Sequence, residues 1–271
     1  MSIYSRFMLR IQTAKLSMAA ASVAFFGFLA LFPGAAVIIA IWGVASDPGF
    51  VRQQIDPLKD VLPPEAFTLF ADQVQALVDA STPGLGWTTL ISTLLALWSA
   101  RAGTSALVSG LNAVHHLPDR GGFLHELLSM LLTMALVGIT ILALLLAVVV
   151  PVALAHVPLG AFAAIALQAA NILLGLVLAV LGLATAYRFG PNRTTPEPIS
   201  FFTPGVIVAL FLWLLASRGF AIYLTNFTSY NKVYGSIGAV AALMMWFYFS
   251  AYAVLLGAAV DADRAARCKV Q

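Results

Sequence analysis

Residues 127–155 read LLSMLLTMALVGITILALLLAVVVPVALA and contain no charged side chain. A helix needs about 20 mainly apolar residues to cross the hydrocarbon core of a bilayer. Comparable runs recur along the chain and predict six transmembrane helices, at 21–45, 87–113, 127–155, 161–187, 201–223 and 235–260. The runs are continuous, whereas strands of a membrane barrel alternate apolar and polar residues over about 10 positions. The sequence therefore predicts an all-α polytopic membrane protein with one six-helix domain over residues 1–271.

Composition points to the same class of protein. Hydrophobic residues make up 61% of the chain and charged residues 9%, against about 25% charged in soluble domains. The single cysteine, Cys268, excludes a disulfide framework and a cysteine-based metal site within the chain. A formal net charge of +3 is too small to suggest a nucleic-acid partner, and no phosphate-binding glycine loop occurs. We therefore expect no cofactor, no metal and no nucleic acid.

The distribution of lysine and arginine orients the helices, because cytoplasmic loops of membrane proteins carry the excess of these residues. With a cytoplasmic N-terminus, nine of the 14 basic residues lie inside and three outside. The inner set is Arg6, Arg10, Lys15, Arg120, Arg188, Arg193, Arg264, Arg267 and Lys269, and the outer set is Arg52, Lys59 and Lys232. The remaining two lie within predicted helices. An even number of crossings then places both termini in the cytoplasm.

Two segments are predicted to be helical without crossing the bilayer. Residues 1–20 carry an apolar stripe at helical spacing beside basic residues, as in a cytoplasmic amphipathic helix on an anionic leaflet. A plain basic flank that fixes topology explains them equally well. Residues 46–86 form a polar insert with six acidic and two basic residues, and Pro63-Pro64-Glu65 is typical of a helix start. We expect this insert to be an acidic helical cap on the outer face.

Several short motifs stand in order along nearly the whole chain. They are Ala24-Phe25-Phe26, Leu31-Phe32-Pro33, Leu97-Trp98-Ser99-Ala100-Arg101-Ala102-Gly103, Leu111-Asn112-Ala113-Val114, Tyr234-Gly235-Ser236-Ile237-Gly238-Ala239, Trp246-Phe247-Tyr248 and Leu256-Gly257-Ala258. Together these motifs resemble the YihY/BrkB family of bacterial inner-membrane proteins. The resemblance implies a six-helix inner-membrane protein, of a family labelled both ribonuclease BN and virulence factor BrkB. It also implies a link to envelope lipid or lipopolysaccharide handling. His115-His116 departs from the family, where an aromatic residue is expected.

The ribonuclease label needs a cluster of acid–base or metal-binding residues that RNA can reach. The candidates follow the second predicted span and are His115, His116, Asp119, His125 and Glu126. Their spacing matches neither His-Glu-x-x-His nor another metal-binding signature. The pattern favours a loop of solvated polar residues over a metal or catalytic site. We therefore do not expect an enzyme.

Arg101 and Arg218 are the charged residues that lie inside predicted spans, where a charge is costly and is a functional hypothesis by default. Arg101 lies near the middle of the second span, so it should face the bundle interior. Its partner there would be a backbone carbonyl, Asn112 or a ligand anion. Arg218 lies in the outer half of the fifth span, where it can reach the outer headgroups and hold an anionic one.

Polar and small residues mark other positions in the spans. Asn112, Gln168 and Asn171 would line or brace a polar route, with interhelical hydrogen bonding as the alternative. Pro33 and Gly34 should kink the first span. The residues before the last span predict a wet outer mouth, and tight helix packing is the competing explanation for its glycines, Gly235 and Gly238. A ladder of small residues in the second span predicts close packing at Ala102, Ala106 and Gly110.

These observations predict an inner-membrane protein that handles an anionic lipid or a lipid-linked envelope precursor. Transport, flipping or transfer would occur without an ATPase of its own, because the chain lacks a nucleotide-binding loop. The alternative is a membrane scaffold that recruits an envelope protein through residues 46–86, and a membrane-bound ribonuclease ranks third. The expected partners are anionic membrane lipids, and a homo-oligomer is compatible with the pattern.

Overall fold

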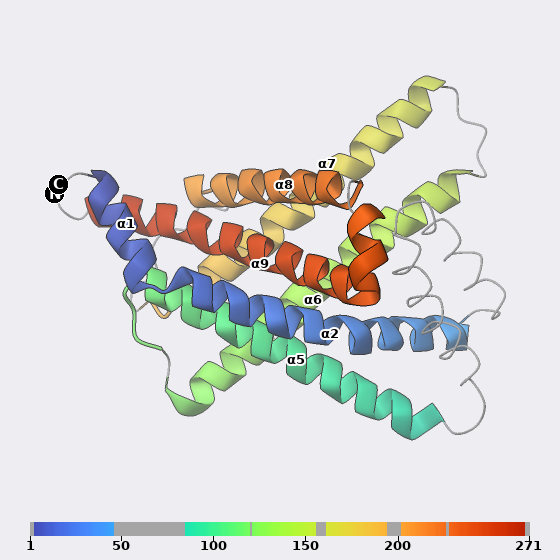
Figure 1. Cartoon of the computed structure of the whole chain (residues 1–271), viewed down its shortest axis with the longest axis horizontal. Helices are drawn as coiled ribbons and strands as arrows, with labels where there is room; N and C mark the ends of the chain where they lie inside the picture. The colour runs from blue at the N-terminus through green and yellow to red at the C-terminus, as the bar shows by residue number, and fades with distance from the viewer. Residues whose placement is uncertain are drawn as a thin grey trace. The chain divides into compact units, whose positions relative to one another are not determined.

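A computed structural model describes residues 3–45, 85–119, 121–155, 161–193, 202–225 and 228–268. These residues form α-helices joined by short turns and include no strand, so the all-α prediction is confirmed for them. In chain order the helices are α1 (Ile3–Thr13), α2 (Leu16–Ala45), α5 (Leu85–Val114), α6 (Gly122–Ala155), α7 (Ala161–Phe189), α8 (Pro204–Thr225) and α9 (Thr228–Cys268) (Figure 1).

Four described helices are long and apolar enough to cross a membrane. The segments are Gly122–Thr140, Ala169–Phe189, Pro204–Tyr223 and Val240–Arg267. A fifth candidate is the pair Phe7–Thr13 and Leu16–Leu31, whose axes meet at 50°. Among the described residues α5 is not a candidate, because its serines, threonines and Arg101 lower its hydropathy. The chain is thus a multi-pass membrane protein, and the count of six spans stays a prediction.

Several boundaries differ from the sequence-based ones. The amphipathic helix predicted at 1–20 ends at Thr13, so residues 16–20 belong to α2. Between the two helices Lys15 has a φ of 47°, a left-handed conformation that costs a non-glycine residue about 1 kcal/mol. α9 begins at Thr228, earlier than the predicted start at 235, so Gly235 and Gly238 lie inside the helix. The wet outer mouth predicted there stays a prediction.

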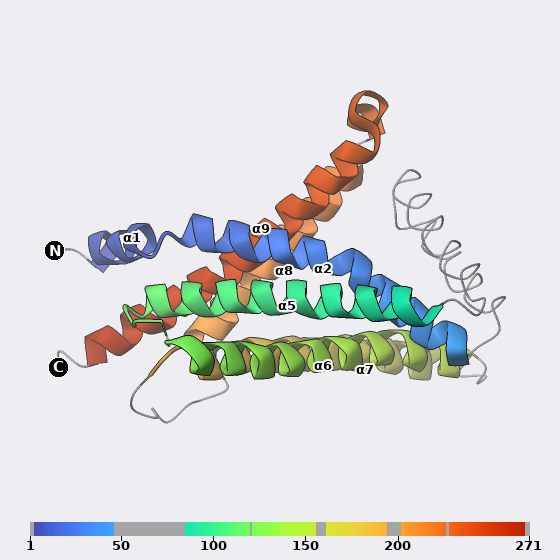
Figure 2. The same cartoon turned by 90° about the horizontal axis from the view of Figure 1, so that it is seen from below.

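Two further predictions concern α2 and the outer insert. α2 continues through Pro33 and Gly34 as one helix, and Figure 2 shows that it bends along its length. The kink predicted at those two residues stays a prediction. The cap predicted at 46–86 lies outside the described residues, except for Leu85 and Gly86, which begin α5.

Packing divides the chain into two compact units. The first comprises Met1–Ala19, Thr104–Trp213 and Tyr252–Gln271, and the second comprises Ala20–Gly103 and Leu214–Ala251. α2, α5, α8 and α9 therefore contribute to both units. Within the first unit, α6 and α7 pack against each other in opposite directions (Figure 2).

In the first unit, α8 and α9 cross where two glycines meet. A methyl group on Gly257 would lie 2.7 Å from Ala209 Cβ and 2.5 Å from Tyr187 Oη, and closer still to the Gly205 carbonyl oxygen. Gly110 of α5 is packed as closely: its added methyl group would lie 2.9 Å from Leu255 Cδ2. The close packing predicted for the small-residue ladder of the second span is therefore confirmed at Gly110.

Aromatic contacts hold the second unit together. The rings of Phe26 in α2 and Trp98 in α5 meet edge to face with centroids 6.2 Å apart. Phe220 in α8 and Trp246 in α9 have centroids 6.3 Å apart, and Trp246 Nε1 donates a hydrogen bond of 3.2 Å to Ser217 Oγ. These pairs connect α2 to α5 and α8 to α9 by apolar contact, as expected for helices in lipid.

Candidate functional site

Asn112 is the centre of a polar network in the first unit. It lies in the last turn of α5 and is 1% exposed. Its Nδ2 donates to Asp119 Oδ1 over 2.8 Å, and its Oδ1 accepts from the backbone N–H of Asn192 over 2.7 Å. Asn192 in turn donates through Nδ2 to the Pro118 carbonyl over 3.1 Å. The side chain of Asn112 therefore ties the end of α5 to the loop before α6 and to the chain after α7.

Two arginines and a histidine gather beside this network at the C-terminus of α5. Arg10 Nη1 donates to the Val114 carbonyl over 2.8 Å, and so satisfies one of the carbonyls that a helix end leaves unpaired. Arg193 Nη2 lies 3.0 Å from His115 Nε2. An arginine can only donate, so Nε2 is the acceptor and His115 is neutral with its hydrogen on Nδ1. That Nδ1 lies 2.9 Å from the Leu111 carbonyl, to which it donates.

Asp261 of α9 caps the N-terminus of α8. Its Oδ1 accepts from the Gly205 N–H over 2.7 Å, and its Oδ2 accepts from Thr203 Oγ1 over 2.5 Å. Thr203 Oγ1 also accepts from the Val206 N–H over 3.2 Å, as an N-cap residue does. The carboxylate lies against the partial positive charge of the helix N-terminus, which stabilises the contact between α8 and α9.

The residues weighed for nuclease chemistry are placed differently from the prediction. His116, Asp119 and Glu126 are exposed, as expected of a solvated loop. His115 and His125 are half-buried and hydrogen-bonded, so the prediction of solvated side chains is wrong for these two. His125 and Glu126 belong to α6 rather than to a loop. Among the described residues no three histidine, cysteine, aspartate or glutamate side chains are grouped to hold a metal ion. Both ring nitrogens of His115 are already hydrogen-bonded.

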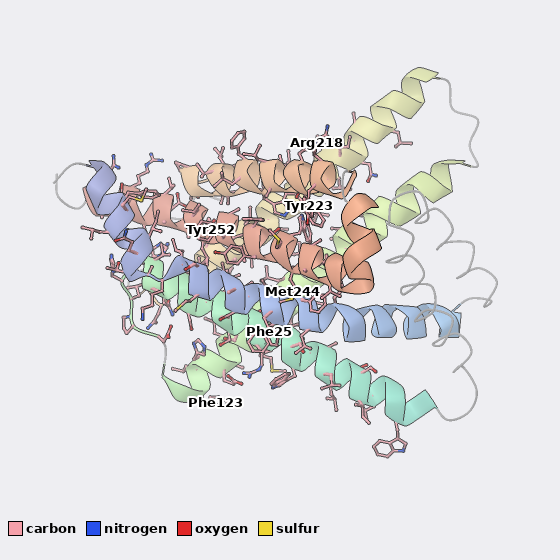
Figure 3. The ribbon with its side chains drawn as sticks, viewed as in Figure 1. Phe25, Phe123, Arg218, Tyr223, Met244 and Tyr252 are labelled. Carbon is pink, nitrogen blue, oxygen red and sulfur yellow. The ribbon has the colours of Figure 1, made fainter. Side chains whose placement is uncertain are left out.

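The predicted lipid-binding residues divide between the two units. Arg101 on α5 is half-buried and interacts with the protein, and Arg218 on α8 is exposed (Figure 3); both belong to the second unit. Asn112 belongs to the first unit, as does Asn171, which is half-buried on α7. The side chain of Gln168 lies outside the described residues.

The suggested pair between Arg101 and Asn112 is not formed. Positions 101 and 112 of one helix are separated by about 16 Å along its axis, which exceeds the reach of an arginine. Asn112 instead binds Asp119, a residue weighed for nuclease chemistry, and Asn192, which the sequence analysis did not single out. These bonds join the end of α5 to two other segments of the first unit, and the role predicted for Asn112 beside a polar route stays a prediction.

Sequence reasoning missed two other polar contacts that hold the first unit. Tyr187 Oη donates to the Val254 carbonyl over 2.5 Å, and Asp261 caps α8 as described above. Thr203-Pro204-Gly205 carried a signal for the second contact, because a threonine before proline is typical of a helix start. Nothing in the local sequence indicated which distant residue would complete the cap.

The chain matches the virulence factor BrkB family over residues 7–270. The protein belongs to this family. Over 270 residues it is 28% identical to the ribonuclease-like protein YfkH of Bacillus subtilis, a match that covers 96% of this chain and 92% of YfkH. No solved structure matches the chain. The family resemblance inferred from the motifs is therefore confirmed.

Shorter matches are to proteins named UPF0761 membrane proteins. A UPF0761 membrane protein of Aeromonas salmonicida is 41% identical over 86 residues, 32% of this chain and 29% of the relative. Another, from Vibrio parahaemolyticus, is 36% identical over 89 residues, 33% of this chain and 28% of the relative. These matches span under a third of each relative, and the printed names agree with a membrane protein.

Proposed function

We propose that this BrkB-family protein binds an anionic lipid in the bacterial inner membrane and moves or transfers it. The observation that carries the proposal is Arg101, a half-buried guanidinium on α5 flanked by Ala100 and Ala102. The sequence predicts that α5 crosses the membrane, although its hydropathy does not place it among the candidate spans of the structure. A charge inside a membrane helix is expensive, and such residues usually face a polar route or a ligand. Lipid phosphate suits a guanidinium because two parallel N–H···O bonds can form.

Arg218 supports the same substrate class. Its side chain is exposed on α8, within the candidate span Pro204–Tyr223 and in the same unit as Arg101. An exposed arginine in this position can extend its head toward the lipid headgroups. Two arginines with different burial would serve as successive contacts for a lipid phosphate.

The acidic residues argue for movement without ion coupling. Glu126 and Asp261 lie near helix ends, and Asp261 is already used to cap α8. Ion-coupled transporters place their coordinating groups near the middle of the membrane. We therefore propose that lipid moves down its gradient or with energy from a partner protein. Cytoplasmic termini, inferred from the basic residues, complete the proposed topology.

Reconstituted liposomes test the proposal. Purified protein is incorporated into vesicles that contain fluorescent phosphatidylglycerol, and dithionite quenching follows movement of the label between leaflets. Arg101→Gln should slow this movement about tenfold, since a hydrogen bond to a charged group contributes about 1.5–3 kcal/mol. Arg101→Lys keeps the positive charge but loses the paired N–H donors of the guanidinium, so it should retain part of the rate. Arg264→Gln, at an exposed arginine of α9, should leave the rate unchanged.

Two results would remove the lipid proposal. The first is equal movement of phosphatidylglycerol in vesicles with and without protein. The second is a wild-type rate in Arg101→Gln when the variant unfolds at the same temperature as the parent. The scaffold alternative depends on residues 46–86, so deleting them and testing for loss of partner recovery examines it separately.

A nuclease function has one observation in its favour, the name of the ribonuclease-like relative YfkH. If this chain shared that chemistry, His115 and His116 would be the residues to test. RNA cleavage by detergent-purified protein that disappears in His115→Ala and His116→Ala would support it. Because His115 already bonds Arg193 and Leu111, we place this function below lipid handling.

A further inference from the structure

Two buried polar atoms without a hydrogen-bond partner lie on one side of α6. They are His125 Nδ1 and Ser129 Oγ, and in the described part of the chain a single other side-chain atom, Ser250 Oγ, shares this condition. His125 and Ser129 are four residues apart, so their side chains neighbour each other on one face of the helix. A buried polar group without a partner costs about 1–3 kcal/mol, so two adjacent ones point to a missing partner.

Ser129 also differs from the hydroxyl residues around it. The buried Thr133 of the same helix donates to the carbonyl four residues earlier, and the exposed Thr140 in α6 and Thr185 in α7 do the same. Ser129 is 0% exposed and makes no such bond, although its carbonyl accepts from Thr133. Its hydroxyl is therefore available to a partner outside the helix backbone.

The facing helix completes the surroundings. Ser105 Oγ of α5 lies 2.9 Å from His125 Nε2, so the imidazole is anchored through one nitrogen and presents the other, Nδ1, to the interior. All three residues belong to the first unit and lie on α5 and α6. One imidazole nitrogen and one hydroxyl, four residues apart on one helix face, are therefore both buried and without a partner, and the imidazole is anchored through its other nitrogen.

We propose that α5 and α6 enclose a binding site for a water molecule that bridges His125 Nδ1 and Ser129 Oγ. The hydrogen of a neutral imidazole can reside on either nitrogen, and a serine hydroxyl can donate or accept. Water suits either tautomer of the imidazole because it both donates and accepts, and buried waters typically satisfy such groups. The chain Ser105, His125, water, Ser129 then continues a polar path from α5 into α6.

The site lies within Gly122–Thr140, a segment apolar enough to cross the membrane. A water held there is an exchangeable ligand, whose place an oxygen of another small polar group can take. The site involves none of the residues assigned to lipid movement, so it stands whether or not the chain moves lipid. If no water binds beside His125, the expected effect of Arg101→Gln on lipid movement is unchanged. If Arg101→Gln has no effect on lipid movement, the proposed water site is likewise unaffected.

Solid-state NMR of the full chain in phosphatidylcholine bilayers tests the site directly. Magnetisation transferred from water should reach the His125 ring, whose signals are assigned by their loss in His125→Gln. Ser129→Ala should weaken that transfer at least several-fold, while Ser250→Ala in α9 should leave it unchanged. Absence of transfer to the His125 ring in the parent protein would overturn the proposal, as would equal transfer in Ser129→Ala and parent.

Thermal unfolding in detergent gives a second readout whose sign separates a wet from a dry site. If water bridges the two groups, Ser129→Ala breaks a hydrogen bond and should lower the unfolding temperature by about 2–4 °C. If the site is dry, removal of an unpaired hydroxyl should raise that temperature, and the proposal fails. Ser250→Ala removes another buried, unpaired hydroxyl, so an equal fall there would show that the effect is not specific to the site and would also overturn it.

Discussion

Substituting Gly257 by alanine should destabilise the protein more than a single methyl group ordinarily does. The added methyl would lie 2.5 Å from Tyr187 Oη and 2.7 Å from Ala209 Cβ, and the Gly205 carbonyl oxygen is nearer than either. Ordinary contacts between such atoms are about 3.5–4.0 Å. Because the nearest atom belongs to the backbone of α8, relief requires the two helices to separate.

The size of the effect follows from three contributions. Overpacking a tight site costs about 1–3 kcal/mol, and the upper end applies where backbone must move. Displacing Tyr187 weakens its bond to the Val254 carbonyl, which contributes about 1 kcal/mol. Alanine regains about 1 kcal/mol because it favours helix over glycine. We therefore expect a net loss of about 3 kcal/mol, which lowers the unfolding temperature by about 6–12 °C.

Tryptophan fluorescence during heating of the detergent-solubilised protein measures the effect, with Gly175→Ala as the matched control. Gly175 lies in α7 with nothing within 4 Å of an added methyl, so that variant should be unchanged or slightly more stable. Gly205→Ala, on the other side of the crossing, should resemble Gly257→Ala. If Gly257→Ala unfolds at the same temperature as Gly175→Ala, the helices do not cross as closely as described and the reasoning fails.

Two further predictions concern the polar contacts of the first unit. Asn112→Ala should lower the free energy of unfolding by about 2–3 kcal/mol, because it removes a partner from both Asp119 and Asn192 and leaves a small cavity. Asn171→Ala, at a half-buried position, should lower it by under about 0.5 kcal/mol. Similar losses of thermal stability in the two variants would contradict the bracing role. Asp261→Ala should lower the free energy of unfolding by about 2 kcal/mol and speed hydrogen exchange of the Gly205 and Val206 amides about 30-fold. Asp261→Asn should have an intermediate effect, because it keeps one acceptor oxygen. The control is Asp263→Asn, which alters the pair with Arg267 instead, and unchanged exchange at Gly205 in Asp261→Ala would refute the cap.

Local sequence was enough to predict the helices themselves. Apolar runs near 20 residues locate α6, α7, α8 and α9 without any knowledge of packing. Lipid offers no hydrogen-bond partners, so the backbone N–H and C=O groups of each run must bond within a helix. Boundaries were harder to predict, as at Thr228, since the polar residues before position 235 resemble a loop. Composition cannot distinguish a polar helical turn from a loop when a neighbouring helix decides the outcome.

At the candidate site, too, the local sequence identified a residue but not its distant partners. Asn112 was singled out because a polar amide in a predicted span is costly, and in the structure it is buried with both ends of its amide hydrogen-bonded. Its partners could not be named, because Asp119 belongs to a loop and Asn192 is 80 residues away along the chain. Hydrophobic periodicity carries no information about which loop folds back on which helix end.

The order of residues by itself determined that this is a helical membrane protein of the BrkB family, since long apolar runs and family motifs are both written in the linear sequence. Tertiary structure alone decided that Asp261 caps α8, that Gly205 meets Gly257, and that His125 presents an unpaired nitrogen beside Ser129. The reason is physical: a side chain's hydrogen bonds and close contacts depend on which distant backbone approaches it, and that approach is set by the packing of whole helices.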